Sequence, residues 1–277
     1  MLLHHLGWEK LPAGYLGVDI FFVISGFLIT RLIADARARS DFRLTTFWAA
    51  RARRLLPAAH LVMLITIPCA WLVLSADAMT GLFRLLLGSL SFTANIVLSK
   101  DIGYFSGTAA LTPLLHMWSL SVEEQYYLLL PPLLLLFPRR IWLAGAIVLT
   151  AASVYLTLHA APRITPTAAY YVLPTRAWQL GLGGIAALSG FDGRLRWLWL
   201  PALAIVLLIP AFPIDPADRA IVFHPGYGAM LVCAATTVLM LAGSPTVERS
   251  RWLHSAGSHV GHSAICKEVA YKPRCRP

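Results

Sequence analysis

Residues 16–33 read LGVDIFFVISGFLITRLI, an apolar block interrupted by one aspartate, Asp19, and one arginine, Arg31. A helix needs about 20 predominantly apolar residues to cross roughly 30 Å of hydrocarbon, so this block approaches the length of a membrane span. The chain as a whole has the same character: 58% of its residues are hydrophobic, 13% are charged, and its mean hydropathy is +0.68. A soluble domain has about 25% charged residues. The composition therefore excludes a soluble globule, a disordered chain and a disulfide-stapled secreted module.

Further apolar blocks predict an all-α, polytopic transmembrane bundle of about seven or eight helices, one of them expected to be re-entrant. Short loops rich in proline and glycine separate the blocks, as at Pro138. The predicted helices cover residues 16–33, 58–74, 79–98, 119–137, 141–158, 177–189, 197–212 and 226–242.

The positive charge is distributed as in a membrane protein. The formal net charge is +10, and the arginines lie in the short segments between apolar blocks, as expected of cytoplasmic loops. Nucleic acid is therefore not an expected partner. The segment 31–54 holds seven arginines and two aspartates and is predicted to be a cytoplasmic loop. The other predicted cytoplasmic segments contain Arg139 and Arg140, Arg194 and Arg196, and Arg249 and Arg251.

The order of these segments predicts that one apolar block does not cross the membrane. An even number of spans must join two cytoplasmic segments, yet three blocks lie between Arg54 and Arg139. The block 79–98 is the weakest, because a central arginine, Arg84, is costly in lipid. It is predicted to be re-entrant, interfacial or enclosed by other helices. The alternative is that Arg139 and Arg140 break the charge rule.

Three ionisable residues at apolar blocks are candidate catalytic residues, since a charge left in hydrocarbon is costly. Asp19 needs a partner within its helix bundle. Glu123 opens another apolar block, and His116 precedes it by seven residues, or two turns along one helical face. Together they could handle a proton. Alternatively, His116 is a structural histidine.

Glu123 and its neighbour Glu124 also have a simpler interpretation. A carboxylate in the first turn of a helix is favoured by the helix dipole, with Ser119 or Ser121 near the cap.

Three ordered stretches resemble the signatures of the bacterial acyltransferase-3 membrane family. The first is GYLGVDIFFVISGFLI at residues 14–29. The second runs from Phe47-Trp48 through Arg51-x-x-Arg54 to Pro57. The third is PLLHMWSLSVEEQYY at residues 113–127. Together they extend the resemblance over most of the chain, from about Leu2 to Ala242.

The resemblance implies an integral membrane O-acyltransferase in the bacterial inner membrane, with several spans. Such enzymes move an acyl group, commonly acetyl from acetyl-CoA, to hydroxyls of extracytoplasmic glycans such as lipopolysaccharide O-antigen, exopolysaccharide or peptidoglycan. The implied partners are the lipid bilayer, acyl-CoA as donor and a cell-surface glycan as acceptor. No bound cofactor is expected.

The resemblance also assigns roles to particular residues. His5 matches the family's essential histidine, and His4 is its less favoured neighbour. A histidine titrates near neutral pH and so suits removal of a proton from a sugar hydroxyl. Asp19 or Glu123 would orient His5. Whether the acyl group attaches covalently to the protein is left open.

Arg51 and Arg54 are the candidate donor-binding residues, because guanidinium groups suit the phosphates of acyl-CoA. The competing interpretation is that these arginines only set the topology. Trp118 and Arg176 are the candidate substrate contacts, and Arg176 could instead be an interfacial anchor. One arginine of the family's pair before the second signature is absent, since the sequence reads Ala50-Arg51.

The predicted domain organisation is an acyltransferase-like transmembrane domain at residues 1–243 and a polar, basic tail at 244–277. The first helix is expected to be incomplete, because the family's arginine would fall six residues before Met1. No metal site is expected, because the tail's histidines and Cys266 lack a second cysteine at matching spacing. Two other functions stay open: an inactive, truncated family member, or a transporter or flippase-like protein.

Overall fold

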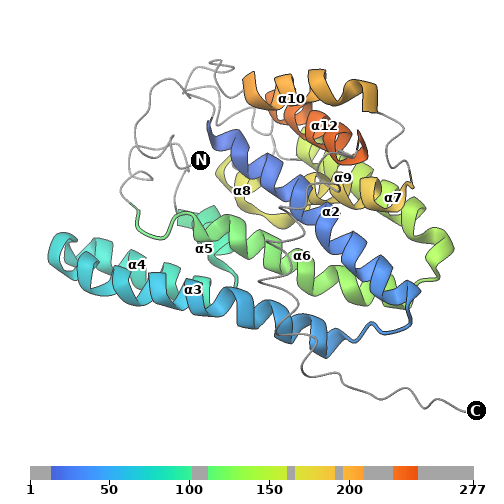
Figure 1. Ribbon diagram of the computed structural model, residues 1–277. Coiled ribbons are helices and arrows are strands. Elements are labelled where there is room, and N and C mark those ends of the chain that lie inside the picture. The colour runs from blue at the N-terminus through green and yellow to red at the C-terminus, as the bar shows by residue number, and fades with distance from the viewer. Residues whose placement is uncertain (1–13, 102–111, 161–165, 191–195, 209–226, 243–277) are drawn as a thin grey trace, which may run out of the picture.

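The computed structural model describes residues 14–101, 112–160, 166–190, 196–208 and 227–242, and every regular element in these ranges is a helix (Figure 1). The predicted all-α fold is confirmed. In chain order the elements are η1 (Gly14–Leu16), α2 (Gly17–Ala38), α3 (Leu44–Val73), α4 (Ala76–Leu90), α5 (Ala94–Asp101), α6 (Met117–Leu136), η3 (Arg139–Ile141), α7 (Trp142–Tyr155), the π-helical turn η4 (Leu156–Ala160), α8 (Pro166–Tyr171), α9 (Leu173–Leu188), η6 (Arg196–Leu198), α10 (Trp199–Leu208) and α12 (Tyr227–Ala242).

Three helical stretches among the described residues are long and apolar enough to cross a membrane. They cover Gly17–Ala38, Leu44–Val73 and Arg139–His159. Trp199–Leu208 and Gly228–Ala242 are also apolar but shorter. Each of the eight predicted apolar blocks is mainly helical where the structure describes it.

The predicted cytoplasmic loop at residues 31–54 is mostly helical, which corrects the sequence interpretation. Helix α2 continues to Ala38 and α3 begins at Leu44, so only residues 39–43 connect them. The segment 44–57 is rich in alanine, leucine and arginine, which are strong helix formers. Hydropathy did not reveal it because its arginines lower the average. Arg51 and Arg54 therefore lie one turn apart on a helix.

The block 79–98 forms two helices rather than one. A turn at residues 91–93, where Phe92 adopts φ 54°, separates the 15-residue α4 from the 8-residue α5. Neither helix reaches the length of a span. The block is therefore broken where a single uninterrupted span would be continuous, and its non-crossing course stays a prediction.

The two arginine-rich segments on either side of that block meet at one end of the molecule. The guanidinium of Arg37, in the last turn of α2, lies 6.0 Å from the ring centre of Trp142 at the start of α7. Figure 1 shows the end of α2, the start of α3 and the start of α7 gathered in this region. This arrangement is the one expected if an even number of spans joins the two segments, which the sequence analysis placed on the same side of the membrane.

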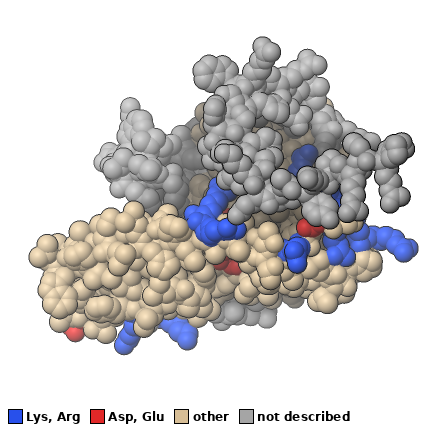
Figure 2. All heavy atoms as spheres, turned by 60° about the horizontal axis from the view of Figure 1, so that its bottom comes forward, with Lys and Arg blue, Asp and Glu red and all other residues tan. Residues whose placement is uncertain are grey.

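Helix α2 lies at the centre of the bundle and α3 at its edge. In the apolar windows of these helices, 61% of α2 is buried but only 11% of α3. Figure 1 shows α3 and α4 running side by side away from the other helices, and Figure 2 shows a broad uncharged surface on this side. The exposed apolar side chains of these two helices include Leu61, Leu64, Ile65, Trp71, Leu72, Val73, Phe83, Leu87 and Leu90.

The backbones of α2 and α9 touch through two glycines. A Cβ at Gly26 would overlap the carbonyl oxygen of Leu180, and a Cβ at Gly183 would overlap that of Val23. Small residues at a helix crossing allow such close approach in membrane proteins. This contact fixes α9 against the middle of α2.

Substitution of Gly26 tests this close contact. We expect Gly26→Ala to lower the thermal stability of the detergent-purified protein, because forcing a methyl group into a packed contact costs about 1–3 kcal/mol. Gly145→Ala is the matched control, since an added Cβ there meets no atom within 4 Å. Equal melting temperatures for the two variants would contradict the α2–α9 contact.

Candidate active site

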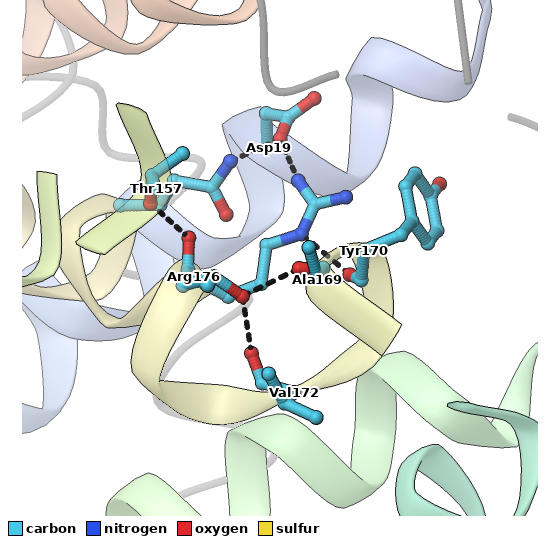
Figure 3. Close-up of polar contacts among 8 residues, drawn as sticks. Asp19, Thr157, Ala169, Tyr170, Val172 and Arg176 are labelled. Carbon is cyan, nitrogen blue, oxygen red and sulfur yellow. Dashed lines mark hydrogen bonds and ion pairs between the residues drawn. The ribbon is translucent and has the colours of Figure 1, made fainter. Parts of the chain in front are cut away.

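The structure buries two groups of charged side chains, and the first lies between α2 and α9. We name Asp19, Tyr170, Arg176 and Gln179 the Asp19 cluster (Figure 3). Arg176 Nη1 donates to Asp19 Oδ1 at 3.0 Å, and both residues are 1% exposed. The side-chain amide of Gln179 donates to the same carboxylate oxygen, and Arg176 Nε donates to the carbonyl oxygen of Tyr170 at 2.8 Å. The partner that Asp19 requires is thus Arg176, and this residue is buried rather than an interfacial anchor.

Aromatic rings enclose the Arg176 guanidinium. Its central carbon lies 4.3 Å from the ring centre of Tyr170 and 5.6 Å from that of Trp118. Trp118 also packs edge-on against Phe22 and Tyr171, with centroid separations of 6.0 and 5.4 Å. Aromatic faces attract a guanidinium most strongly where water is excluded. The rings therefore help to keep the cation in place.

The second group, which we name the Arg51 cluster, joins α2, α3 and α6. It consists of Ser25, Arg51, Glu123, Glu124 and Tyr127. Arg51 Nη2 lies 3.2 Å from Glu124 Oε1 and 3.8 Å from Glu123 Oε1. Ser25 Oγ donates to Glu123 Oε1 at 2.7 Å, and the Tyr127 hydroxyl donates to the same oxygen. The Arg51 guanidinium also lies over the Tyr127 ring, 3.8 Å from its centre.

The two clusters occupy successive levels of α2. Asp19 and Ser25 are six residues apart, which corresponds to about 9 Å along a helix axis. Phe22 lies midway between them and contacts Trp118, and both side chains are at most 2% exposed. An apolar layer therefore separates the two groups of charge.

A pair of amides anchors α5 to α6 beside these clusters. Asn95 Nδ2 donates to Gln125 Oε1 at 3.4 Å and Gln125 Nε2 donates to Asn95 Oδ1 at 2.9 Å. Gln125 Nε2 also donates to the carbonyl oxygen of Phe92, at 2.8 Å, in the turn between α4 and α5. The broken helix is thus tied to the helix that carries Glu123.

The structure does not bring His116 and Glu123 together. His116 is exposed and directly precedes α6, whereas Glu123 is buried about 10 Å further along the helix axis. Helix α6 begins at Met117, so Glu124 is not in its first turn. Ser119 and Ser121 bond carbonyl groups at the start of the helix instead of capping its N–H groups. The dipole interpretation is therefore wrong for both Glu123 and Glu124, and both carboxylates lie beside Arg51.

Other predicted residues lie apart from the clusters or outside the description. Arg54 is exposed and makes no hydrogen bond or ion pair within the described residues. His5, His4, Arg194 and the tail 244–277 with Cys266 lie outside the described residues. In the described part of the chain, no group of three or more histidine, cysteine or acidic side chains is arranged to hold a metal ion.

Sequence reasoning missed four residues that complete the clusters, namely Ser25, Tyr127, Tyr170 and Gln179. Gln179 follows Arg176 by three residues and Tyr127 follows Glu123 by four, so helical spacing could have indicated both. Ser25 carried no such signal, because its partner Glu123 lies 98 residues away.

A bundle of long apolar helices that buries two paired charge clusters has the architecture of a membrane protein with a polar interior. The chain belongs to the acyltransferase-3 family, because the family's model, described as an acyltransferase domain, matches residues 3–265.

Several curated proteins are similar to this chain. A provisionally named membrane-bound transacylase of Komagataeibacter xylinus, BcsY, is 35% identical over 91% of this chain and 63% of its own length. A provisionally named peptidoglycan O-acetyltransferase of Bacillus subtilis, YrhL, is 34% identical over 73% of this chain and 33% of its own length. The peptidoglycan O-acetyltransferase OatA of Listeria monocytogenes is 31% identical over 67% of this chain and 31% of its own length. The chain thus spans between about a third and two thirds of the length of these relatives. No solved structure matches it.

Removal of Arg176 tests the Asp19 cluster. We expect Arg176→Met to destabilise the protein by about 3–5 kcal/mol, because a buried carboxylate loses its counter-charge. Combining it with Asp19→Asn should restore much of the loss, since no buried charge then remains in the Asp19 cluster. Thermal unfolding of the detergent-purified variants measures both effects.

Arg39→Ala is the control for that comparison. Arg39 pairs with Asp41, but their side chains are 65% and 61% exposed, so the melting temperature should hardly change. A double variant as unstable as Arg176→Met alone would show that the ion pair is not the source of stability.

Proposed function

We propose that this protein is an integral membrane O-acyltransferase that moves an acyl group, most simply acetyl, from a coenzyme A thioester at the cytoplasmic face to a hydroxyl of an extracytoplasmic glycan. Membership of the acyltransferase-3 family supports the reaction class, and the names of the relatives support O-acetylation. The single observation that carries the proposal is the contact of Arg51 with Glu123 and Glu124. It joins a helix that begins at the arginine-rich end to the helix that bears the buried carboxylates.

The reaction is the conversion of a thioester into an oxygen ester. The hydroxyl oxygen of the acceptor bonds to the acyl carbon while the carbon–sulfur bond breaks. The hydroxyl proton passes to a base on the protein and then to the departing thiolate of coenzyme A. A histidine is suited to this transfer near neutral pH. The proposal therefore keeps His5 as the base, and Asp19, Glu123 and His116 as further candidates for catalysis.

The proposed substrate contacts follow from the separation of the arginine-rich end from the Asp19 cluster. Arg51 and Arg54 would receive acyl-CoA from the arginine-rich end. Trp118 and Arg176, which are buried at the level of the Asp19 cluster, are kept as the candidate contacts to the acceptor. The proposed location is the bacterial inner membrane, with several spans in the lipid bilayer. The acceptor is a cell-envelope glycan, for which peptidoglycan, lipopolysaccharide and exopolysaccharide are the candidates.

Removal of both donor-side arginines tests the donor assignment. We expect Arg51→Ala combined with Arg54→Ala to lower kcat/KM for acetyl-CoA by about 10-fold or more, since a hydrogen bond to a charged group contributes about 1.5–3 kcal/mol. The assay follows radiolabelled acetyl from acetyl-CoA into the glycan fraction of membrane vesicles. Arg39→Ala, which changes an exposed arginine at the same end, is the control. Unchanged kcat/KM in the double variant would overturn the donor assignment.

The two adjacent histidines allow a matched test of the proposed base. His5→Ala should reduce kcat about 10²- to 10⁴-fold, the usual contribution of a general base. His4→Ala should leave kcat close to that of the unchanged protein. Both variants are assayed with saturating acetyl-CoA, and membrane insertion is checked by immunoblot of the membrane fraction. Full activity of His5→Ala would exclude His5 as the base.

A further inference from the structure

Arg51 and Arg54 belong to one R-x-x-R motif but differ in their surroundings. The Arg51 side chain is 21% exposed and belongs to the Arg51 cluster. Arg54, one turn later on α3, is exposed and makes no ion pair or hydrogen bond with the part of the chain that the structure describes. The first arginine is held in one orientation, whereas the second is a charge on a flexible stem. The two residues are therefore suited to different tasks.

Several contacts hold the Arg51 guanidinium. Its Nη2 faces Glu124 at 3.2 Å, and its flat face lies on the Tyr127 ring. The Tyr127 hydroxyl in turn bonds to Glu123, which Ser25 also contacts. The indole N–H of Trp48, one turn before Arg51, donates to the backbone carbonyl of Tyr127 at 3.3 Å. Tyr127 thus supports both the guanidinium and the helix that carries it.

One buried donor of this guanidinium has no acceptor in the described part of the chain. Arg51 Nε is buried and has no hydrogen-bond partner within the described residues. A buried donor without an acceptor is costly and uncommon in folded proteins, and a ligand oxygen can supply the acceptor that the protein does not. A ligand oxygen that satisfies this buried donor would meet Arg51 at Nε.

The charge around Arg51 restricts the kind of oxygen that can bind there. Within the described residues, a single guanidinium faces two carboxylates, Glu123 and Glu124, which are 5% and 14% exposed. A phosphate carrying its own negative charge would be repelled by both carboxylates at close range. A neutral carbonyl oxygen would not be, and it gains from a charge-assisted hydrogen bond.

We propose that the Nε–H of Arg51 binds the thioester carbonyl oxygen of the acyl donor, that Tyr127 positions Arg51 for this contact, and that Arg54 binds the phosphates of the donor. This inference rests on the proposed function. During transfer the carbonyl oxygen gains negative charge as the hydroxyl adds to the acyl carbon. It loses that charge when the carbon–sulfur bond breaks. Arg51 then stabilises the transition state, and Arg54 contributes to binding alone.

The experiment separates chemistry from binding. Coenzyme A, which lacks the thioester, is titrated into the detergent-purified full chain by calorimetry, and transfer from acetyl-CoA is measured separately. Arg51→Lys keeps the charge beside Glu124 but removes Nε–H. We expect kcat to fall about 100-fold, as when an oxyanion donor is lost, with the Kd of coenzyme A changed less than about threefold. We expect Arg54→Ala to raise that Kd about 10-fold, with kcat nearly unchanged.

Tyr127 provides the second arm, with its neighbour as a control. Tyr127→Leu removes the ring beneath the guanidinium and should lower kcat about 10-fold, within the range of a desolvated cation–π contact. The Kd of coenzyme A should stay the same, a split that simple loss of folding would not produce. Tyr126→Phe changes the adjacent tyrosine by one hydroxyl and should alter neither quantity. Thermal unfolding confirms that each variant is folded.

Two results would overturn the inference. One is a loss of coenzyme A affinity in Arg51→Lys as large as that in Arg54→Ala, because it would assign Arg51 to the phosphates. The other is an unchanged kcat in Arg51→Lys. Either can occur while the double alanine variant still loses kcat/KM, in which case the proposed function stands. If the double alanine variant is unaffected, the proposed function itself fails.

Discussion

The close contact of α2 with α9 is the constraint on which the buried charges depend. Gly26 and Gly183 let the two backbones touch, and this approach places Asp19 within reach of Arg176 and Gln179. A carboxylate removed from water is tolerated only when an opposite charge and further hydrogen bonds surround it. A wider crossing would leave Asp19 without that shell. Packing and electrostatics at this crossing are thus two parts of one requirement.

The apolar pattern predicted the helices well, because the length and composition of a block are local properties. Its errors occurred where local signals mislead: α3 begins fourteen residues before the predicted block, because arginines lower the hydropathy of a helical segment. Only the even number of spans required between two cytoplasmic segments indicated that the block 79–98 is unusual, and it did not indicate a break between α4 and α5. The positions of the apolar helical segments were therefore predictable, whereas helix ends made of polar residues were not.

The candidate site was predictable in its members but not in its pairings. Asp19 and Glu123 were identified because a charge in an apolar block needs an explanation, and Arg51 and Arg176 were named with the family resemblance. The sequence suggested His116 as the neighbour of Glu123, since helical spacing reports contacts within one helix only. The observed partners come from other helices, as with Ser25, which lies 98 residues from Glu123. Contacts between helices depend on packing, and the spacing of residues in a single sequence does not predict them.

The two charge clusters are held in place by different forces. The Asp19 cluster lies where backbones touch, so tight packing sets its geometry. Helix α3, in contrast, buries only Phe47, Met63 and Ala70, and its polar link to α6 runs through Trp48 and Arg51. Arg51 therefore occupies its position because Glu124 and Tyr127 attract it, and the attraction compensates for sparse packing. A cation placed by its partners rather than by a close-packed core can leave one buried N–H without an acceptor, as at Arg51 Nε within the described residues, which is the property that an oriented donor requires.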